Sequence, residues 1–142
     1  MFQNLTLSVV RSGGRNRTGR VTCYHRGGGT RLRYRVVDFS RVFRLPAIIR
    51  GFEKDPRRKT VVALVCYANG ALSFILCSKN MGIGALTVSG PHAPIFEGNH
   101  LPLFFIPQGS SVFNGPFFVN SGSFARAPGS YAKLLSKRRK FS

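Results

Sequence analysis

The chain has 142 residues, of which 22 are Lys or Arg and only four are Asp or Glu, so its formal net charge is +18. Such a chain cannot neutralise its charge internally, and self-repulsion opposes compaction unless a polyanion binds. The scarcity of carboxylates weighs against acid–base catalysis, and no apolar run reaches the ~18 to 20 residues of a membrane span. The length allows one ordinary domain, or a small domain with extensions that fold against a partner.

The basic residues are concentrated at the two ends of the chain. Residues 1–59 hold 15 of the 22, residues 60–125 hold only Lys79, and residues 126–142 hold six. This distribution favours a small domain with basic extensions. Nucleic acid is the expected polyanion, because arginine matches phosphate bidentately and counterion release drives association. A membrane surface is the alternative, but it favours a basic amphipathic helix, and the glycine-rich N-terminal segment is a poor helix former.

Residues 1–35 are predicted to form an extended RNA-binding arm. From Arg11 the segment reads RSGGRNRTGRVTCYHRGGGTRLRYR, with two glycine clusters, interleaved arginines and almost no apolar periodicity. A backbone without Cβ atoms can approach phosphates and riboses closely, and its amides can donate to them. The arginines are expected to fix the register on the phosphates. Tyr24 and Tyr34 are expected either to stack on unpaired bases or to pack on the domain.

Two strands and a basic turn are predicted next. Val36, Val37 and Phe39 indicate a first strand, and residues 47–52 a second, with a proline just before it. Asp55 and the proline after it then indicate a turn. This turn carries Arg57, Arg58 and Lys59, which are either a solvated charge run or, as the neighbouring arm favours, a second set of phosphate contacts.

The clearest local signal is a β-hairpin in VVALVCYANGALSFILC. Two β-rich runs flank Asn69 and Gly70, a pair that suits the positive φ angles of a two-residue type I′ turn. The first run, residues 61–67, is apolar at every position, so both of its faces are expected to be covered. Residues 86–89 and 110–113 are predicted as further short strands.

These short strands, with no convincing helix between them, predict an all-β fold. A small OB-fold barrel, a closed form that avoids exposed sheet edges, is expected over residues 36–119. Residues 120–142 become basic again, with a strand indicated at residues 131–135 and then KRRK without further partner sequence. They are predicted to begin a second domain. Both ends of the chain are expected to be held in a complex.

Catalytic and metal sites are not expected. The four carboxylates are scattered and are predicted to form ion pairs or to cap turns. Cys23, Cys66 and Cys77 match no zinc motif and are predicted to be reduced thiols of an intracellular protein, and the histidines lack metal-ligand spacing. No cofactor is expected, apart from structural Mg²⁺ ions of an RNA partner. The 13 phenylalanines exceed the needs of one small core, so protein contacts are expected from some of the four in Pro/Gly-rich loops, Phe104, Phe105, Phe117 and Phe118.

Four motifs in order carry a family resemblance. SGGRNRTGRVTCYHRGGGTRLRYRVVDF resembles the arm of the universal large-subunit ribosomal protein usually called L-two. FEKDPRRKTVVALVCYANG, GNHLPLFFIPQGSSVFN and SFARAPGSYAKLL are similar to later motifs of the same family, in N-terminal to C-terminal order. The resemblance implies a structural, non-enzymatic constituent of the large subunit that binds and stabilises rRNA. It also implies an OB-fold barrel followed by the start of an incomplete SH3-like barrel.

The resemblance, with the charge pattern of the arm and of the turn, predicts RNA contacts from three segments. The arm residues are Arg11, Ser12, Gly13, Gly14, Arg15, Asn16, Arg17, Gly19, Arg20, His25, Arg26, Gly27, Gly28, Gly29, Arg31, Arg33, Tyr34 and Arg35. Those of the turn and the C-terminal segment are Arg57, Arg58, Lys59, Arg126, Ser130 and Tyr131.

The chain also departs from the family pattern. Tyr24 and Thr30 stand where the family has a basic residue or His, one of Arg57 and Arg58 stands where it has Asn, and several polar barrel positions are apolar. Because the chain ends just inside the second barrel, a separate chain is expected to supply the C-terminal half. The sequence drift, the added phenylalanines and the lack of a clear import signal favour a mitochondrial ribosome, with plastid or cytosolic ribosomes as alternatives.

The expected partners are large-subunit rRNA, neighbouring ribosomal proteins and the completing chain, with no membrane. A free-standing OB-fold protein that binds single-stranded nucleic acid is the second hypothesis. A protein-interaction adaptor that uses the Phe-rich loops is the third.

Overall fold

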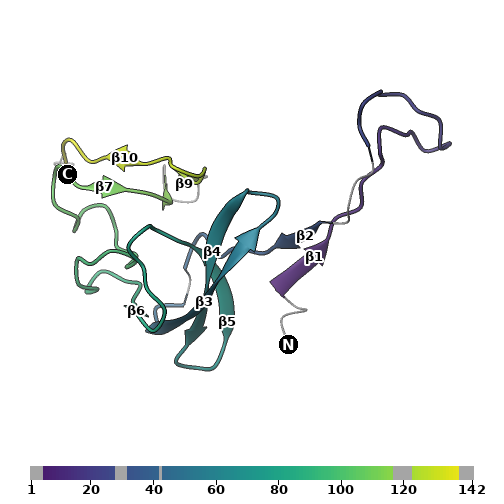
Figure 1. Cartoon of the computed structure of the whole chain (residues 1–142). Coiled ribbons are helices and arrows are strands. Elements are labelled where there is room, and N and C mark those ends of the chain that lie inside the picture. The colour runs from purple at the N-terminus through teal and green to yellow at the C-terminus, as the bar shows by residue number, and fades with distance from the viewer. Residues whose placement is uncertain (1–4, 28–31, 42, 117–122, 138–142) are drawn as a thin grey trace.

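The computed structural model describes residues 5–27, 32–41, 43–116 and 123–137, and within these ranges the fold is all-β, without an α-helix. The same ranges therefore hold no helix that is long and apolar enough to cross a membrane. Figure 1 shows a curled sheet in the middle, the N-terminal arm extending to one side and the C-terminal strands on the other. The predicted all-β, OB-fold-like architecture is confirmed.

The central sheet has four antiparallel strands in the order β5-β4-β3-β6. They are β3 (Ala47–Asp55), β4 (Thr60–Tyr67), β5 (Leu72–Leu76) and β6 (Leu86–Thr87). The register between β3 and β4 shifts between Ile49 and Gly51, and such a bulge bends and twists the strand that contains it. The strands expected at residues 47–52 and 86–89 are confirmed, although β3 runs on to Asp55 and β6 is shorter.

Strand β4 is buried on both faces from Val62 to Val65, as its apolar sequence predicts, although Val61 is 45% exposed. Val62 and Leu64 belong to a cluster with Phe74, whereas Ala63 and Val65 face the opposite side. Phe74, Val62, Ala63 and Val65 are all 0% exposed. Each apolar side chain of this size contributes roughly 1.5 to 3 kcal/mol when it is fully buried, so this sheet is the core of the chain.

The predicted β-hairpin joins β4 to β5, but the prediction of a two-residue type I′ turn was wrong. The Tyr67 amide donates to the Ala71 carbonyl (2.9 Å), which leaves the three-residue loop 68–70. Gly70 has a φ of 80°, and Asn69 is not among the residues with positive φ. This pattern is a type I turn followed by a left-handed glycine. The Asn69 side chain accepts from the Ala71 amide instead (3.0 Å).

A ladder at the base of the arm replaces the strand that was expected from Val36 to Phe39. Strand β1 (Thr6–Ser8) pairs antiparallel with β2 (Arg33–Arg35). Val37 makes only an isolated parallel bridge to Phe74. The expected strand from Val36 to Phe39 was therefore wrong. Pairing with β1 ends at Arg35, and Val37, which is only 6% exposed, packs its side chain into the core.

The C-terminal segment pairs with residues that precede it in the chain. Strand β10 (Ala132–Lys133) pairs with β7 (Ser111–Val112), and β9 (Ser123–Phe124) pairs with β8 (Gly115–Pro116). Short strands near residues 110–113 and 131–135 are thereby confirmed, and the latter finds its partner within this chain. The predicted domain boundary between residues 119 and 120 stays a prediction. Phe117 and Phe118 lie outside the described residues.

Candidate nucleic-acid interface

The arm is a long loop whose two ends pair with each other in the β1–β2 ladder (Figure 1). Asn16 organises its tip, because the side-chain Oδ1 accepts from the Thr18 amide, the Thr18 hydroxyl and the Arg20 amide at 3.0, 2.7 and 3.0 Å. Arg15 and Val21 form an antiparallel bridge just behind the tip. The sequence indicated an extended arm, and the structure adds that the arm holds its own conformation.

Gly14 shows why the first glycine cluster is needed. Its φ is +73°, and a Cβ built there would lie 2.2 Å from the Cys23 carbonyl oxygen. The Gly14 carbonyl accepts from the Thr22 and Cys23 amides at 2.8 and 3.1 Å. The close backbone approach expected for RNA is used here by the arm itself, to join its outgoing and returning segments.

Most arginines in the described part of the arm face solvent. Arg35 is partly buried, but the others are exposed, as is His25; they are Arg11, Arg15, Arg17, Arg20, Arg26 and Arg33. Arg15 makes a long hydrogen bond to the Gly13 carbonyl (3.4 Å). Of the two ion pairs found in the described ranges, one holds Arg35 at the base of the arm, and neither involves the exposed arginines. These charges are therefore available to phosphates, whose binding they favour by counterion release. Gly28, Gly29 and Arg31 lie outside the described residues.

The arginines at the base of the arm are held by carboxylates of the sheet. Arg35 donates two hydrogen bonds to one oxygen of Glu53, at 2.9 and 2.7 Å. Arg58 pairs with Asp55 at 2.5 Å and also donates to the Tyr34 hydroxyl (3.2 Å) and the Arg35 carbonyl (3.3 Å). These contacts fasten β2 to the β3–β4 turn. The carboxylates form ion pairs as the sequence predicts, although Asp55 is fully buried.

Asp55 and Arg58 each favour the charged form of the other. Burial raises the pKa of the Asp55 carboxyl, but hydrogen bonds from Arg58 and from the Arg57 amide, with the Arg58 charge, outweigh it, so its pKa lies below the ordinary value. For Arg58, burial lowers the pKa, and the bonds to Asp55 and Tyr34 reverse this and raise it. The pair is thus ionised at neutral pH. Arg58 is engaged in the fold, whereas its neighbour Arg57 is exposed.

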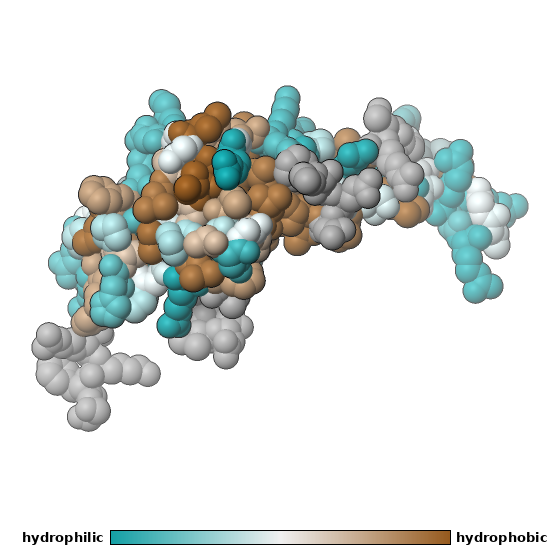
Figure 2. Space-filling view, turned by 90° about the horizontal axis from the view of Figure 1, so that it is seen from below, coloured by the Kyte–Doolittle hydropathy of each residue, from teal (hydrophilic) through white to brown (hydrophobic). Residues whose placement is uncertain are grey.

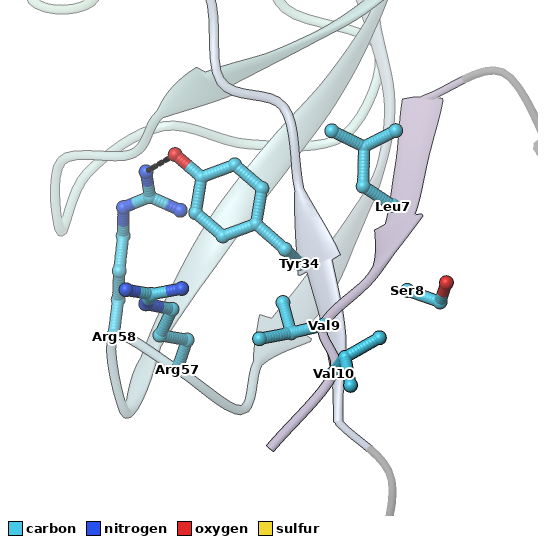
Figure 3. Close-up of a pocket in the computed structure, with 7 residues that line it drawn as sticks. All are labelled: Leu7, Ser8, Val9, Val10, Tyr34, Arg57 and Arg58. Atoms are coloured by element: carbon cyan, nitrogen blue, oxygen red, sulfur yellow. Dashed lines mark hydrogen bonds between the residues drawn. The ribbon is translucent and has the colours of Figure 1, made fainter. Parts of the chain in front are cut away.

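A groove lies between the end of β1 and the β3–β4 turn. Figure 3 shows Tyr34 projecting from β2 toward Arg57 and Arg58, with Val9 and Val10 beside it. The guanidinium of Arg57 lies 5.3 Å from the centre of the Tyr34 ring and that of Arg58 lies 5.2 Å from it. Lys59, also predicted as an RNA contact, is exposed on the same turn with a φ of 54°.

One C-terminal candidate, Arg126, lies near this turn. Phe39 links it to Arg58, because the Arg126 guanidinium lies 4.4 Å from its ring centre and that of Arg58 lies 5.5 Å from it. The Ser130 hydroxyl donates to the Ala127 carbonyl (2.6 Å), and Tyr131 is 70% exposed. Figure 2 shows the apolar surface over the middle of the molecule and polar residues along the arm.

Three features of this region were not found by sequence reasoning. The apolar wall formed by Leu7, Val9 and Val10 belongs to an N-terminal patch that carries no motif. The hydrogen bonds of Arg58 to Asp55 and Tyr34 could not be predicted, because in the sequence Arg58 belongs to a charge run that is typical of solvated side chains. Arg41 is buried too, donating to the Thr87 hydroxyl (2.6 Å) and the Gly98 carbonyl (2.9 Å), and burial lowers its pKa.

In the described ranges no group of three His, Cys, Asp or Glu side chains could hold a metal ion.

Comparisons with known proteins match almost the whole chain. A family model described as Ribosomal Proteins L2, RNA binding N-terminal domain, matches residues 2–89. A large ribosomal subunit protein uL2 from Rickettsia canadensis is 39% identical over 138 residues, which cover 96% of this chain and 50% of the relative. A protein of the same name from Cereibacter sphaeroides is 38% identical over 137 residues, with coverages of 95% and 49%. The chain spans about half the length of the curated relatives it matches.

Proposed function

Because this chain belongs to the ribosomal protein L2 family, we propose that it is a non-enzymatic structural constituent of the large ribosomal subunit that binds and stabilises its rRNA. The observation that carries the proposal is the arm, which presents exposed arginines on a backbone whose conformation is held by hydrogen bonds within the arm. A structure of this kind can lie along phosphates with little ordering cost, since its conformation is already set. Neighbouring ribosomal proteins are the further partners.

The predicted contacts divide into two groups under this proposal. The exposed arm arginines, Arg57 and Lys59 are the primary phosphate contacts. Arg35 and Arg58, which already bind Glu53 and Asp55, support the base of the arm, and any contact they make with RNA is secondary. Structural Mg²⁺, if present, belongs to the RNA partner.

The test is sedimentation of the tagged chain with ribosomal subunits at moderate salt. We expect the chain to migrate with the large subunit and to be lost from it when five exposed arm arginines are changed to Gln, namely Arg11, Arg15, Arg17, Arg20 and Arg26. A matched variant neutralises five exposed cations elsewhere and should retain most of the association. Its positions are Arg44, Arg50, Lys54, Lys79 and Lys133. Recovery of the wild-type chain only at the top of the gradient would contradict the proposal and favour a free-standing OB-fold protein.

We further propose a mitochondrial ribosome and a separate chain for the part of the relatives beyond this match. The named relatives are bacterial and support a ribosomal location; the compartment rests on the sequence departures, such as the apolar Leu72, Phe104 and Phe113. Mass spectrometry of purified mitochondrial large subunits should find this chain and a second polypeptide matching the C-terminal half. A peptide that continues directly past Ser142 would contradict the separate chain, and recovery only from plastid or cytosolic ribosomes would contradict the compartment.

A further inference from the structure

The groove between β1 and the β3–β4 turn combines an apolar wall with a cationic one. Leu7, Val9 and Val10 line one side, and Arg57 and Arg58 line the other, around Tyr34 (Figure 3). We propose that this groove binds one unpaired nucleotide of the RNA, with its base against Arg57 and the apolar wall. The inference rests on the proposed function, because it requires the bound polyanion to be RNA.

The chemistry of the two walls matches a nucleotide. Val10 is 90% exposed and Leu7 is 55% exposed, so this wall offers apolar surface that the fold leaves uncovered. A base has an apolar face and is attached to an anionic phosphate, and the opposite wall is cationic. In a duplex the faces of a base are covered by its neighbours, so the fitting ligand is a base that has left the stack.

Arg57 is the side chain best placed to contact that base. Its guanidinium lies near the Tyr34 ring, 5.3 Å from the centre, while its backbone amide is held by the Asp55 carboxylate at 2.9 Å. The side chain is exposed. A guanidinium plane that lies against a ring on one side can receive a base on the other, and its N–H groups remain free to reach a phosphate.

Arg58 differs from Arg57 because it holds the Tyr34 ring in place. Its bonds to the Tyr34 hydroxyl (3.2 Å) and to Asp55 fix the ring before any ligand arrives. A groove that is already ordered loses little side-chain entropy on binding. The two adjacent arginines therefore act differently: Arg58 positions Tyr34, and Arg57 contacts the nucleotide.

The experiment compares two RNA hairpins of equal length in their affinity for the full chain. One carries a single bulged 2-aminopurine and the other carries the same base paired in the stem. We expect the bulged probe to bind roughly tenfold more tightly, as a base that stacks on a protein side chain does, and its fluorescence to fall on binding. Arg57→Lys keeps the charge but removes the planar group, so the affinity ratio should fall toward one.

Two further variants make the result specific. Arg44→Lys makes the same chemical change at an exposed arginine outside the groove and should leave the ratio unchanged. Val10→Ser alters an exposed side chain, does not threaten folding, and should lower the ratio severalfold. Equal affinity of the wild-type chain for both probes would overturn the groove proposal alone. Failure to bind either probe at moderate salt would overturn the proposed function as well.

Discussion

The arm and the central sheet use the same residue type in opposite ways. In the sheet and at its margins, Arg35, Arg41 and Arg58 donate to carboxylates, carbonyls and hydroxyls of the protein. The arm arginines before Arg35 that the structure describes are exposed and take part in none of the described ion pairs. The charges of Arg35, Arg41 and Arg58 are satisfied within the protein, whereas those of the exposed arm arginines are left to a ligand. Net charge alone therefore overstates how many cations are available to RNA.

The largest expected effect comes from the core of the sheet. Phe74→Ala removes a side chain that is 0% exposed and should lower the free energy of unfolding by about 3 to 5 kcal/mol. Val21→Ala, on the arm and 42% exposed, should change it by less than about 0.5 kcal/mol. Chemical denaturation followed by circular dichroism measures both. Similar losses for the two variants would contradict the contrast between the regions.

Asp55 tests the junction between the two regions. Asp55→Asn removes the carboxylate that binds Arg58 and should cost about 1.5 to 3 kcal/mol of unfolding free energy at pH 7. The folded-state pKa of Asp55 is lowered, so its contribution is complete above its unfolded pKa of about 3.9 and is lost as the pH falls through the folded value. The difference between wild type and variant should therefore shrink below about pH 4.

Denaturation curves measured at several pH values check this prediction. Glu53→Gln, at the partly exposed pair with Arg35, is the matched control and should cost less. A gap between wild type and Asp55→Asn that stays constant from pH 7 to pH 3 would contradict the assigned cause.

Gly14 tests whether the arm holds its own course. Gly14→Ala places a Cβ against the Cys23 carbonyl in a left-handed backbone, and should destabilise the arm locally by about 1 to 3 kcal/mol. Gly19→Ala shares the positive φ but meets nothing within 4 Å, so its effect should be smaller. Hydrogen exchange should show faster exchange at the Thr22 and Cys23 amides in Gly14→Ala, with the sheet unchanged. Equal protection in both variants would mean that this close approach does not order the arm.

The smallest effect concerns a single exposed charge. Arg17→Gln should weaken RNA binding only a few fold, and should reduce the slope of log affinity against log salt by about 0.7 to 0.9, one phosphate contact. Arg58→Gln should leave that slope almost unchanged, because its guanidinium is held by Asp55. Binding measured across a salt series separates the two. The same slope change in both variants would place Arg58 among the phosphate contacts.

Sequence reasoning succeeded where a signal is local. The apolar run from Val61 to Tyr67 and the following Asn-Gly pair specify a hairpin through short-range preferences, and the four motifs specify the family. The β1–β2 ladder joins two three-residue segments that do alternate polar and apolar residues, Thr6–Ser8 and Arg33–Arg35, but alternation does not say which segments pair, so only tertiary structure shows their pairing. The turn type differed from the prediction because Ala68, which carries no turn signal, joins the loop. The inward role of Arg58 depends on Tyr34 and Asp55, which the sequence does not bring together.

The β1–β2 ladder also has a topological consequence. Since Thr6 pairs with Arg35 and Ser8 with Arg33, the arm leaves the domain and returns to it as a doubled chain without a free end. A doubled chain of this form enters an opening tip first and needs room for two strands, whereas a free terminus needs room for one. Under the proposed function, the RNA channel around the arm must therefore be wide enough for two protein strands.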